Sequence, residues 1–181
     1  MKITIALLAA LAAGALAPQD MHRAPAPLEQ HKWLQQLVGE WTARAEATME
    51  PGAEPMRIES VESVRSIGGL WIVAESRSIG EEPPLTSVLQ LGYDPDQKGF
   101  VGTWIDSMQT RMWTYRGELD AAREVLTLQS EGPFFGDPAK SARYRDVIEL
   151  TGPDTKVLSS SVETEDGTWI QFLRAEYKRK E

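Results

Sequence analysis

The 181-residue sequence contains no cysteine and no asparagine, and it has only two histidines. Without cysteine there can be no disulfide, no thiolate nucleophile, no iron–sulfur cluster and no zinc–cysteine site. Without asparagine there can be no N-glycosylation. The sequence also lacks the Gly-x-Ser-x-Gly elbow of serine hydrolases, a phosphate-binding glycine loop and a dinucleotide-binding fingerprint. No His-rich metal-binding spacing is present, so no metal site is predicted, although an all-carboxylate calcium site stays open.

Positive charge is scarce in this chain. There are 19 lysine and arginine residues against 27 aspartate and glutamate residues, which gives a formal net charge of −8 at pH 7. Nucleic acids and anionic membrane surfaces favour basic partners, so neither is expected to bind. The basic run Lys178 to Lys180 is predicted to be a solvated tail. The length and the 41% hydrophobic content predict one globular domain.

The N-terminal segment predicts export. Lys2 precedes an apolar, alanine-rich run over residues 3–16, and the small residues that follow fit a signal-peptidase site after Ala15 or Ala17. The run is shorter than the roughly 20 residues that span a bilayer, so stable membrane insertion is not expected. We therefore predict a signal peptide at 1–17 and a periplasmic or secreted bacterial protein. The proline-containing stretch 18–27 is predicted to be a flexible linker.

Residues 28–181 predict a single all-β domain. A short helical stripe spans 28–37, and from Gly39 apolar and polar residues alternate as in a half-buried strand. Glycine, proline and aspartate mark the turns that follow, and no connection is long enough for a crossover helix. Further strands are expected at about 55–66, 70–79, 85–93, 98–108, 110–118, 123–130, 141–150, 155–163 and 168–178.

Roughly ten consecutive strands favour an antiparallel up-and-down β-barrel of the lipocalin or fatty-acid-binding type, with the short N-terminal helix over one end. A two-sheet sandwich is the alternative, because strand spacing does not separate the two folds. The inward faces of strands 55–66 and 155–163 are left open, since neither has a clear alternation.

Several motifs resemble the bacterial family known as domain of unknown function 1579. The opening His31 to Trp41, the turn Gly92 to Pro95, the strand Thr103 to Met108 and the closing Tyr177 to Lys180 carry the resemblance, which covers about residues 28–180. Gly39-Glu40-Trp41 is similar to the Gly-x-Trp signature of lipocalins, where the tryptophan plugs the closed end of the barrel. The resemblance implies a calycin-type barrel with a central cavity and implies no specific activity.

The positions of the histidines argue against haem as a cofactor. A neighbouring group of similar ten-stranded barrels binds haem through a histidine near the C-terminal strands. This chain has only His22 and His31, both before the first strand, and histidine is the usual neutral axial ligand. We therefore predict no cofactor.

The richest predicted site lies on two consecutive strands. Trp104 and Asp106 share one face with Met108, and Arg111, Trp113 and Tyr115 share a face of the next strand, across a turn expected around Met108 to Thr110. If both faces point inward, they form an apolar pocket with convergent polar groups. The alternative is that the tryptophans fill the core while Asp106 pairs with Arg111 at the rim.

Three further residues are candidates for the same cavity. Glu75 is expected on one face with Trp71, where burial would raise its pKa and suit it to acid–base chemistry; an exposed or arginine-paired glutamate is the alternative. Tyr144 is expected to point inward with its hydroxyl bonded, while Arg143 and Arg145 face water. His31 is expected at the barrel mouth, as a proton shuttle or a packing residue.

The sequence thus favours an exported barrel that binds a small apolar or aromatic ligand without catalysis. Two alternatives stay open: an enzyme that uses Glu75 or Asp106 with His31 or Tyr115, and a structural envelope protein with a filled core. The predicted ligand-binding residues are Trp41, Trp71, Glu75, Trp104, Asp106, Arg111, Trp113, Tyr115 and Tyr144.

Overall fold

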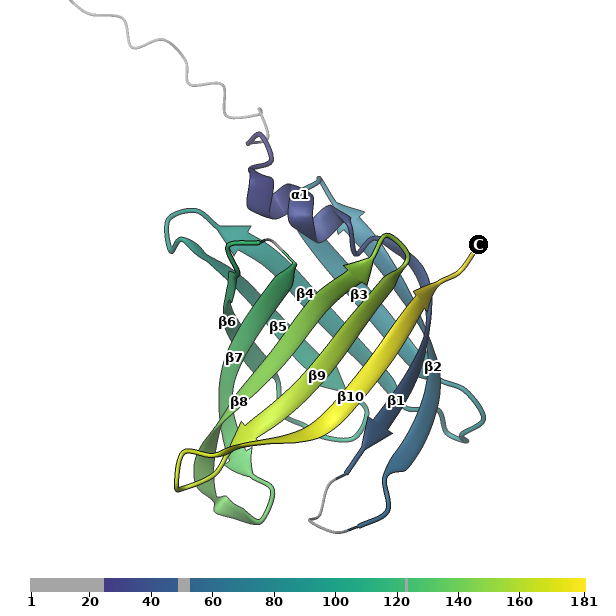
Figure 1. Ribbon diagram of the computed structural model, residues 1–181, viewed down its shortest axis with the longest axis vertical. Coiled ribbons are helices and arrows are strands. Elements are labelled where there is room, and N and C mark those ends of the chain that lie inside the picture. Colours follow the sequence, from purple (N-terminus) through teal and green to yellow (C-terminus); the bar gives the residue numbers. More distant parts are fainter. Residues whose placement is uncertain (1–24, 49–52, 123) are drawn as a thin grey trace, which may run out of the picture.

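The computed structural model describes residues 25–48, 53–122 and 124–181, and it is a closed antiparallel barrel (Figure 1). Each strand pairs with its neighbours in sequence, and the first strand pairs with the last, so the sheet has no free edge. This arrangement confirms the predicted barrel and excludes the sandwich. The predicted signal peptide, and the predicted linker up to residue 24, lie outside the described residues.

The element bounds agree with the predicted ranges to within a few residues in most places. The helix is α1 (Glu29–Gln35). The strands are β1 (Gly39–Ala47), β2 (Met56–Ile67), β3 (Trp71–Ser78), β4 (Thr86–Asp94), β5 (Gly99–Asp106), β6 (Trp113–Leu119), β7 (Val125–Phe134), β8 (Asp137–Gly152), β9 (Thr155–Glu163) and β10 (Trp169–Arg179).

Two connections differ from the prediction. The β5–β6 connection spans 107–112 and is longer than the tight turn expected around residues 108–110. The Asp106 carboxylate accepts hydrogen bonds from the Met108 amide and the Gln109 side chain, which ends β5 as an aspartate turn. The connection left between the strands expected at 123–130 and 141–150 is much shorter than predicted, because β7 continues to Phe134 and β8 begins at Asp137, with a register shift between Pro133 and Phe134.

The two ends of the barrel differ. The helix α1 lies across the end where β1 begins and β10 finishes, while the other end has connections alone (Figure 1). Beneath the helix the interior is densely packed, which gives the molecule its hydrophobic core. The side chains that are at most 2% exposed there are Trp33, Leu34, Leu37, Trp41, Ile72, Leu91, Phe100, Leu126 and Leu128.

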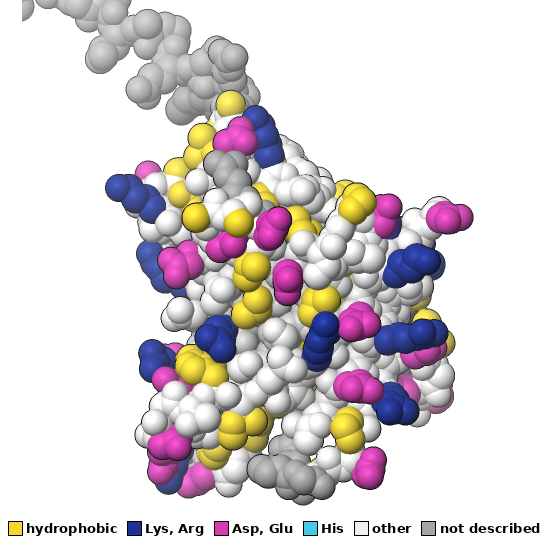
Figure 2. Space-filling view, in the orientation of Figure 1, with side chains coloured by type: hydrophobic (Ala, Val, Ile, Leu, Met, Phe, Trp, Pro, Cys, Tyr) yellow, Lys and Arg dark blue, Asp and Glu magenta, His cyan; other side chains and the backbone are white. Residues whose placement is uncertain are grey.

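The outside of the barrel is a mixed polar surface. Figure 2 shows positive and negative side chains interspersed, with hydrophobic side chains scattered between them, on the face formed largely by β7 to β10 and β1. Among the described residues, no helix is both long and apolar enough to cross a membrane.

Candidate functional site

We infer a chamber in the half of the barrel away from α1, from the burial of its inward side chains. Strand pairing fixes which residues face inward; for example, Trp41 on β1 is opposite Glu62 on β2, and Leu89 on β4 is opposite Trp104 on β5. In mid-barrel several inward residues are only half-buried, in contrast to the fully buried layer under the helix. Because the wall is closed, we attribute this residual exposure to space inside the barrel. The half-buried inward residues are Ala45, Ile58, Ser60, Ser76, Leu89, Trp104, Asp146, Leu158 and Leu173.

The two sides of this chamber have different chemistry. The wall from β1 to β4 is built from alanine, serine and aliphatic side chains, and it settles the inward face of β2 as Ile58, Ser60, Glu62 and Val64. The opposite wall is aromatic, from Trp104 through Trp113 and Tyr115 to Tyr144. Small residues facing aromatic ones leave room for a flat or elongated apolar group.

Trp113 is the central side chain of the aromatic wall. Its ring packs edge-on against Tyr144 at 4.9 Å and lies 5.3 Å from the Arg111 guanidinium. It covers Gly132, where a Cβ atom would come within 2.4 Å of the indole ring. The indole Nε1 is buried and has no hydrogen-bond partner among the described residues. A buried donor without an acceptor is unfavourable. Because this nitrogen has no accessible surface, a ligand acceptor could reach it only if neighbouring side chains move.

Asp146 provides the polar group of the chamber. Its carboxylate accepts a hydrogen bond from the Tyr115 hydroxyl and another from Ser160. Although the residue is partly open to the chamber, the carboxyl group is surrounded by protein atoms, and this burial raises its pKa. Burial first, and the Asp146 charge second, raise the pKa of Tyr115. Tyr115 therefore stays a neutral donor to the carboxyl group.

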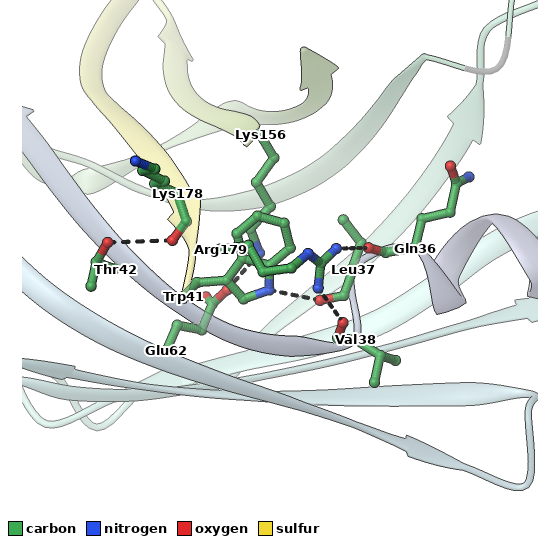
Figure 3. A network of polar contacts seen from close by, with 9 residues as sticks. All are labelled: Gln36, Leu37, Val38, Trp41, Thr42, Glu62, Lys156, Lys178 and Arg179. Carbon is green, nitrogen blue, oxygen red and sulfur yellow. Dashed lines mark hydrogen bonds and ion pairs between the residues drawn. The ribbon is translucent and has the colours of Figure 1, made fainter. Parts of the chain in front are cut away.

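The helix-covered end holds a buried ion pair (Figure 3). Lys156 Nζ lies 2.5 Å from a Glu62 carboxylate oxygen, and the two side chains are 8% and 10% exposed. Lys156 also lies over the rings of Trp41 and Tyr177, at 4.6 and 4.5 Å. Burial lowers the pKa of Lys156, and the nearby Glu62 carboxylate opposes this shift. Burial raises the pKa of Tyr177. This pair neutralises its own charge.

Trp41 and Arg179 complete this end. The Trp41 indole N–H donates to the Leu37 carbonyl at 2.9 Å, and the side chain is fully buried. The Arg179 guanidinium lies 4.1 Å from the Trp41 ring and donates to the carbonyls of Val38 and Gln36 (Figure 3). Trp41 therefore plugs the barrel, as the Gly-x-Trp resemblance implied, and does not line the chamber.

His31 fixes the helix to the barrel. It is 5% exposed, its Nδ1 accepts the Leu28 amide at 2.9 Å, and its Nε2 lies 3.1 Å from the Tyr93 carbonyl. These partners assign the proton to Nε2, which donates to that carbonyl. His31 thus sits at the helix-covered end, on the opposite side of the packed core from the end that α1 does not cover.

Trp71 and Glu75 lie on the outer surface, so the expectation that they share an inward face is wrong. Trp71 is 41% exposed, and its ring covers Gly92 from outside, where a Cβ atom would come within 2.2 Å. Glu75 is 60% exposed and faces Arg65 at 3.9 Å, which confirms the alternative of an exposed, arginine-paired glutamate. The inward residues of β3 are those that alternate with them, including Ile72 and Ala74.

Asp106 and Arg111 lie at the open rim and do not pair with each other. Asp106 is held in its own turn by the Met108 amide, and Arg111 donates to the Glu131 carbonyl at 3.1 Å. Met108, expected on the inward face, is 70% exposed at the same rim. Exposed apolar side chains collect around this opening: Met56, Ile79, Met108, Met112, Phe135 and Ile170.

A second hollow, of about 690 Å³, lies on the outside of the barrel. Most of its lining residues occupy outward strand positions, among them the ion pairs Arg44–Glu59 and Arg174–Glu176. Its charged side chains already pair across the surface, so it is a less suitable site for an apolar ligand than the chamber.

The two buried polar pairs, Tyr115–Asp146 and Glu62–Lys156, were not predicted from the sequence. Asp146 shares an alternating face with Tyr144, and this was the available signal for its inward position. No signal could have paired Glu62 with Lys156, which are 94 residues apart. Among the described residues, no group of three histidine, cysteine, aspartate or glutamate side chains could hold a metal ion.

Comparison with known proteins gives a family and a fold. The family model described as "Protein of unknown function (DUF1579)" matches residues 26–179. A sequence search of curated proteins found no match. The S-type phycobiliprotein lyase CPES from Guillardia theta is similar in structure, with 13% identity, a TM-score of 0.54 and coverage of 86% of this chain and 99% of that one. Rv2717c from M. tuberculosis gives 13% identity, a TM-score of 0.56 and coverage of 85% and 99%.

Proposed function

From the premise that this chain belongs to the DUF1579 family, we propose that it binds a small, mostly apolar or aromatic ligand in the chamber. The observation that carries the proposal is the buried Trp113 N–H with no described acceptor, on an aromatic wall that faces small side chains. A ligand that stacks on this wall and accepts that hydrogen bond would satisfy the orphan donor.

The open rim supports the same function. Its exposed methionine and isoleucine side chains, such as Met108, offer an apolar surface where a ligand could first bind. Phe135 packs on Tyr144 and Phe172 at 5.4 and 4.8 Å, so entry to the barrel would require this ring to move. Methionine is flexible, so a methionine-bearing rim can adapt to a passing ligand. The predicted exported location fits a carrier or scavenger of small molecules, and it remains a prediction because residues 1–17 are outside the described range.

The test is calorimetric titration of the purified protein with 2-naphthylmethanol, a neutral aromatic probe with one acceptor oxygen. We expect saturable one-site binding and quenching of tryptophan fluorescence. Ala45→Phe fills the chamber from β1 and should abolish binding, whereas Thr42→Phe adds the same ring on the outward face and should not. Binding that survives Ala45→Phe and is lost in Thr42→Phe would place the site outside the barrel.

Trp113→Phe tests the hydrogen bond itself. It keeps an aromatic ring and removes the N–H, so affinity should fall by a few-fold to about tenfold, as expected for one neutral hydrogen bond. Trp169→Phe is the matched control, because Trp169 stacks with Arg145 away from the chamber. Equal affinities of the two variants and the wild type would exclude Trp113 as the ligand's donor.

A further inference from the structure

Among the described residues, one carboxyl group in the interior of the barrel, that of Asp146, has no cation beside it. Lys156 and Glu62 neutralise each other at the helix-covered end. Asp146, by contrast, receives only the neutral donors Tyr115 and Ser160, and no described lysine, arginine or histidine forms an ion pair with it. The neighbouring Arg145 does not compensate it, because its guanidinium stacks 4.4 Å from the outer Trp169 ring.

An uncompensated carboxyl group at this depth is unfavourable for the empty protein. Its two described partners are donors from the wall, and a carboxylate accepts about four hydrogen bonds, so it retains acceptor capacity toward the chamber. A group that brings positive charge and N–H donors would satisfy that capacity. The hydrogen bonds formed would be charge-assisted, and therefore stronger than neutral ones.

The rest of the chamber suits the same chemistry. Trp104, Trp113 and Tyr144 present aromatic rings inward, and aromatic faces attract organic cations as well as apolar groups. The described connections at the mouth carry Glu54, Glu81, Glu82, Glu165 and Asp166 against Arg111. Glu165 is paired with Lys140 on β8 at 2.5 Å, and the other acidic groups leave a local excess of negative charge that would favour the approach of a cation.

We propose that the chamber selects an aromatic or alkyl amine, bound as the ammonium, with its nitrogen at Asp146 and its apolar body on the aromatic wall. This inference rests on the proposed function, because it specifies the polar end of the ligand that the chamber takes. Asp146 is then the anchor at the deep end, and an acceptor atom on the apolar body of the ligand, nearer the mouth, would take the Trp113 N–H. The naphthyl amine used below has no such acceptor and tests the Asp146 contact alone.

The test is a charge series on one skeleton: 2-naphthylmethylamine, 2-naphthylmethanol and 2-naphthoate, titrated into the wild-type protein at pH 7. We expect the amine to bind about tenfold to a hundredfold more tightly than the alcohol, as hydrogen bonds to charged groups imply, and the carboxylate to bind most weakly. An alcohol or carboxylate that binds as tightly as the amine overturns the inference and leaves the chamber as an apolar site. No binding by any of the three overturns the proposed function together with the inference.

Asp146→Asn then assigns the preference to this residue. Asparagine keeps an acceptor for Tyr115 and removes the charge, so the amine should lose its tenfold or greater advantage while the alcohol binds as before. Asp96→Asn is the matched control: it removes the same charge at an exposed turn beside the helix-covered end and should leave the amine preference unchanged. Circular dichroism confirms that both variants fold. An amine preference that persists in folded Asp146→Asn overturns the assignment.

Discussion

At the scale of single residues, the interior polar groups differ in whether they have a partner of opposite charge. Lys156 has Glu62 at 2.5 Å and lies between two aromatic rings. A buried pair of this kind contributes little compared with a well-packed apolar pair, but losing one member leaves the other charged and buried. We therefore expect the main role of the pair to be specificity: it determines which residues meet at the helix-covered end and adds little to the free energy of unfolding.

Lys156→Met should lower the free energy of unfolding by about 3–5 kcal/mol, because it leaves the Glu62 carboxylate without its cation. Urea unfolding followed by tryptophan fluorescence measures the change. The double variant Glu62→Leu/Lys156→Met should recover most of the loss, since no buried charge then remains. If the double variant is as unstable as the single one, packing and not charge governs this position.

Alternation along a strand predicted the inward positions of Trp104, Trp113 and Tyr144 correctly and failed on β3. There Ile72, Val73 and Ala74 are all buried in succession, so apolar character does not distinguish the two faces. The pairing of β3 with β2 decides which residues of β3 face inward. Such a cross-strand register depends on the whole barrel and cannot be read from one strand.

At the scale of elements, α1 acts as a plug whose position is set by the segment that follows it. Gly39 has φ of 137°, a conformation that favours glycine, and a Cβ atom there would come within 2.4 Å of the Arg179 guanidinium. Absence of a side chain thus lets Arg179 reach the carbonyls of Gln36 and Val38. The Gly-x-Trp motif joins the helix, the first strand and the last strand.

Leu34→Ala should destabilise the protein by about 2–5 kcal/mol, because Leu34 is fully buried between the helix and the core and leaves a cavity when truncated. Lys32→Ala on the exposed side of the same short helix should change stability by less than about 0.5 kcal/mol. Thermal and urea unfolding of both variants provide the comparison. Equal, small effects would mean that α1 is not packed on the barrel in solution.

The pattern of helix followed by regularly spaced strands was enough to predict this element order. The connection between β5 and β6 was not predictable in length, because Asp106 can either continue a strand or begin a turn, and its side-chain bonds to Met108 and Gln109 favour the turn. Because the turn begins at Asp106, Met108 and Arg111 lie in the connection at the rim and not on the inward strand faces where they were expected.

At the scale of the whole molecule, the pH dependence of stability should include two carboxyl groups whose pKa values shift in opposite directions on folding. Burial raises the pKa of Asp146 above its unfolded value, so the native state binds this proton more tightly than the unfolded state. Stability from this group is fully present below the unfolded pKa and is lost as pH rises through the folded pKa. Asp146→Asn should therefore gain stability relative to wild type as pH increases from about 4 to 7.

Asp94 provides the opposite case. Hydrogen bonds from Gln97, chiefly from its backbone, lower the pKa of this exposed turn carboxylate. Its contribution is present above the unfolded pKa and is lost on acidification, so Asp94→Asn should lose stability relative to wild type at neutral pH and approach it near pH 3. Denaturant midpoints of wild type and both variants across this range give the test. A difference that does not change with pH would show that neither carboxyl group contributes through its titration.

The pairing of β1 with β10 has a further consequence. Trp41 to Ala47 run antiparallel to Leu173 to Arg179, so the ten hairpin-linked strands form a ring with no first member. Joining the two ends with a short linker and opening the chain within the exposed connection 79–85 would preserve all ten strand pairings. Such a circular permutant is expected to fold, and it would place both new termini beside the mouth, where a reporter could be fused next to the chamber.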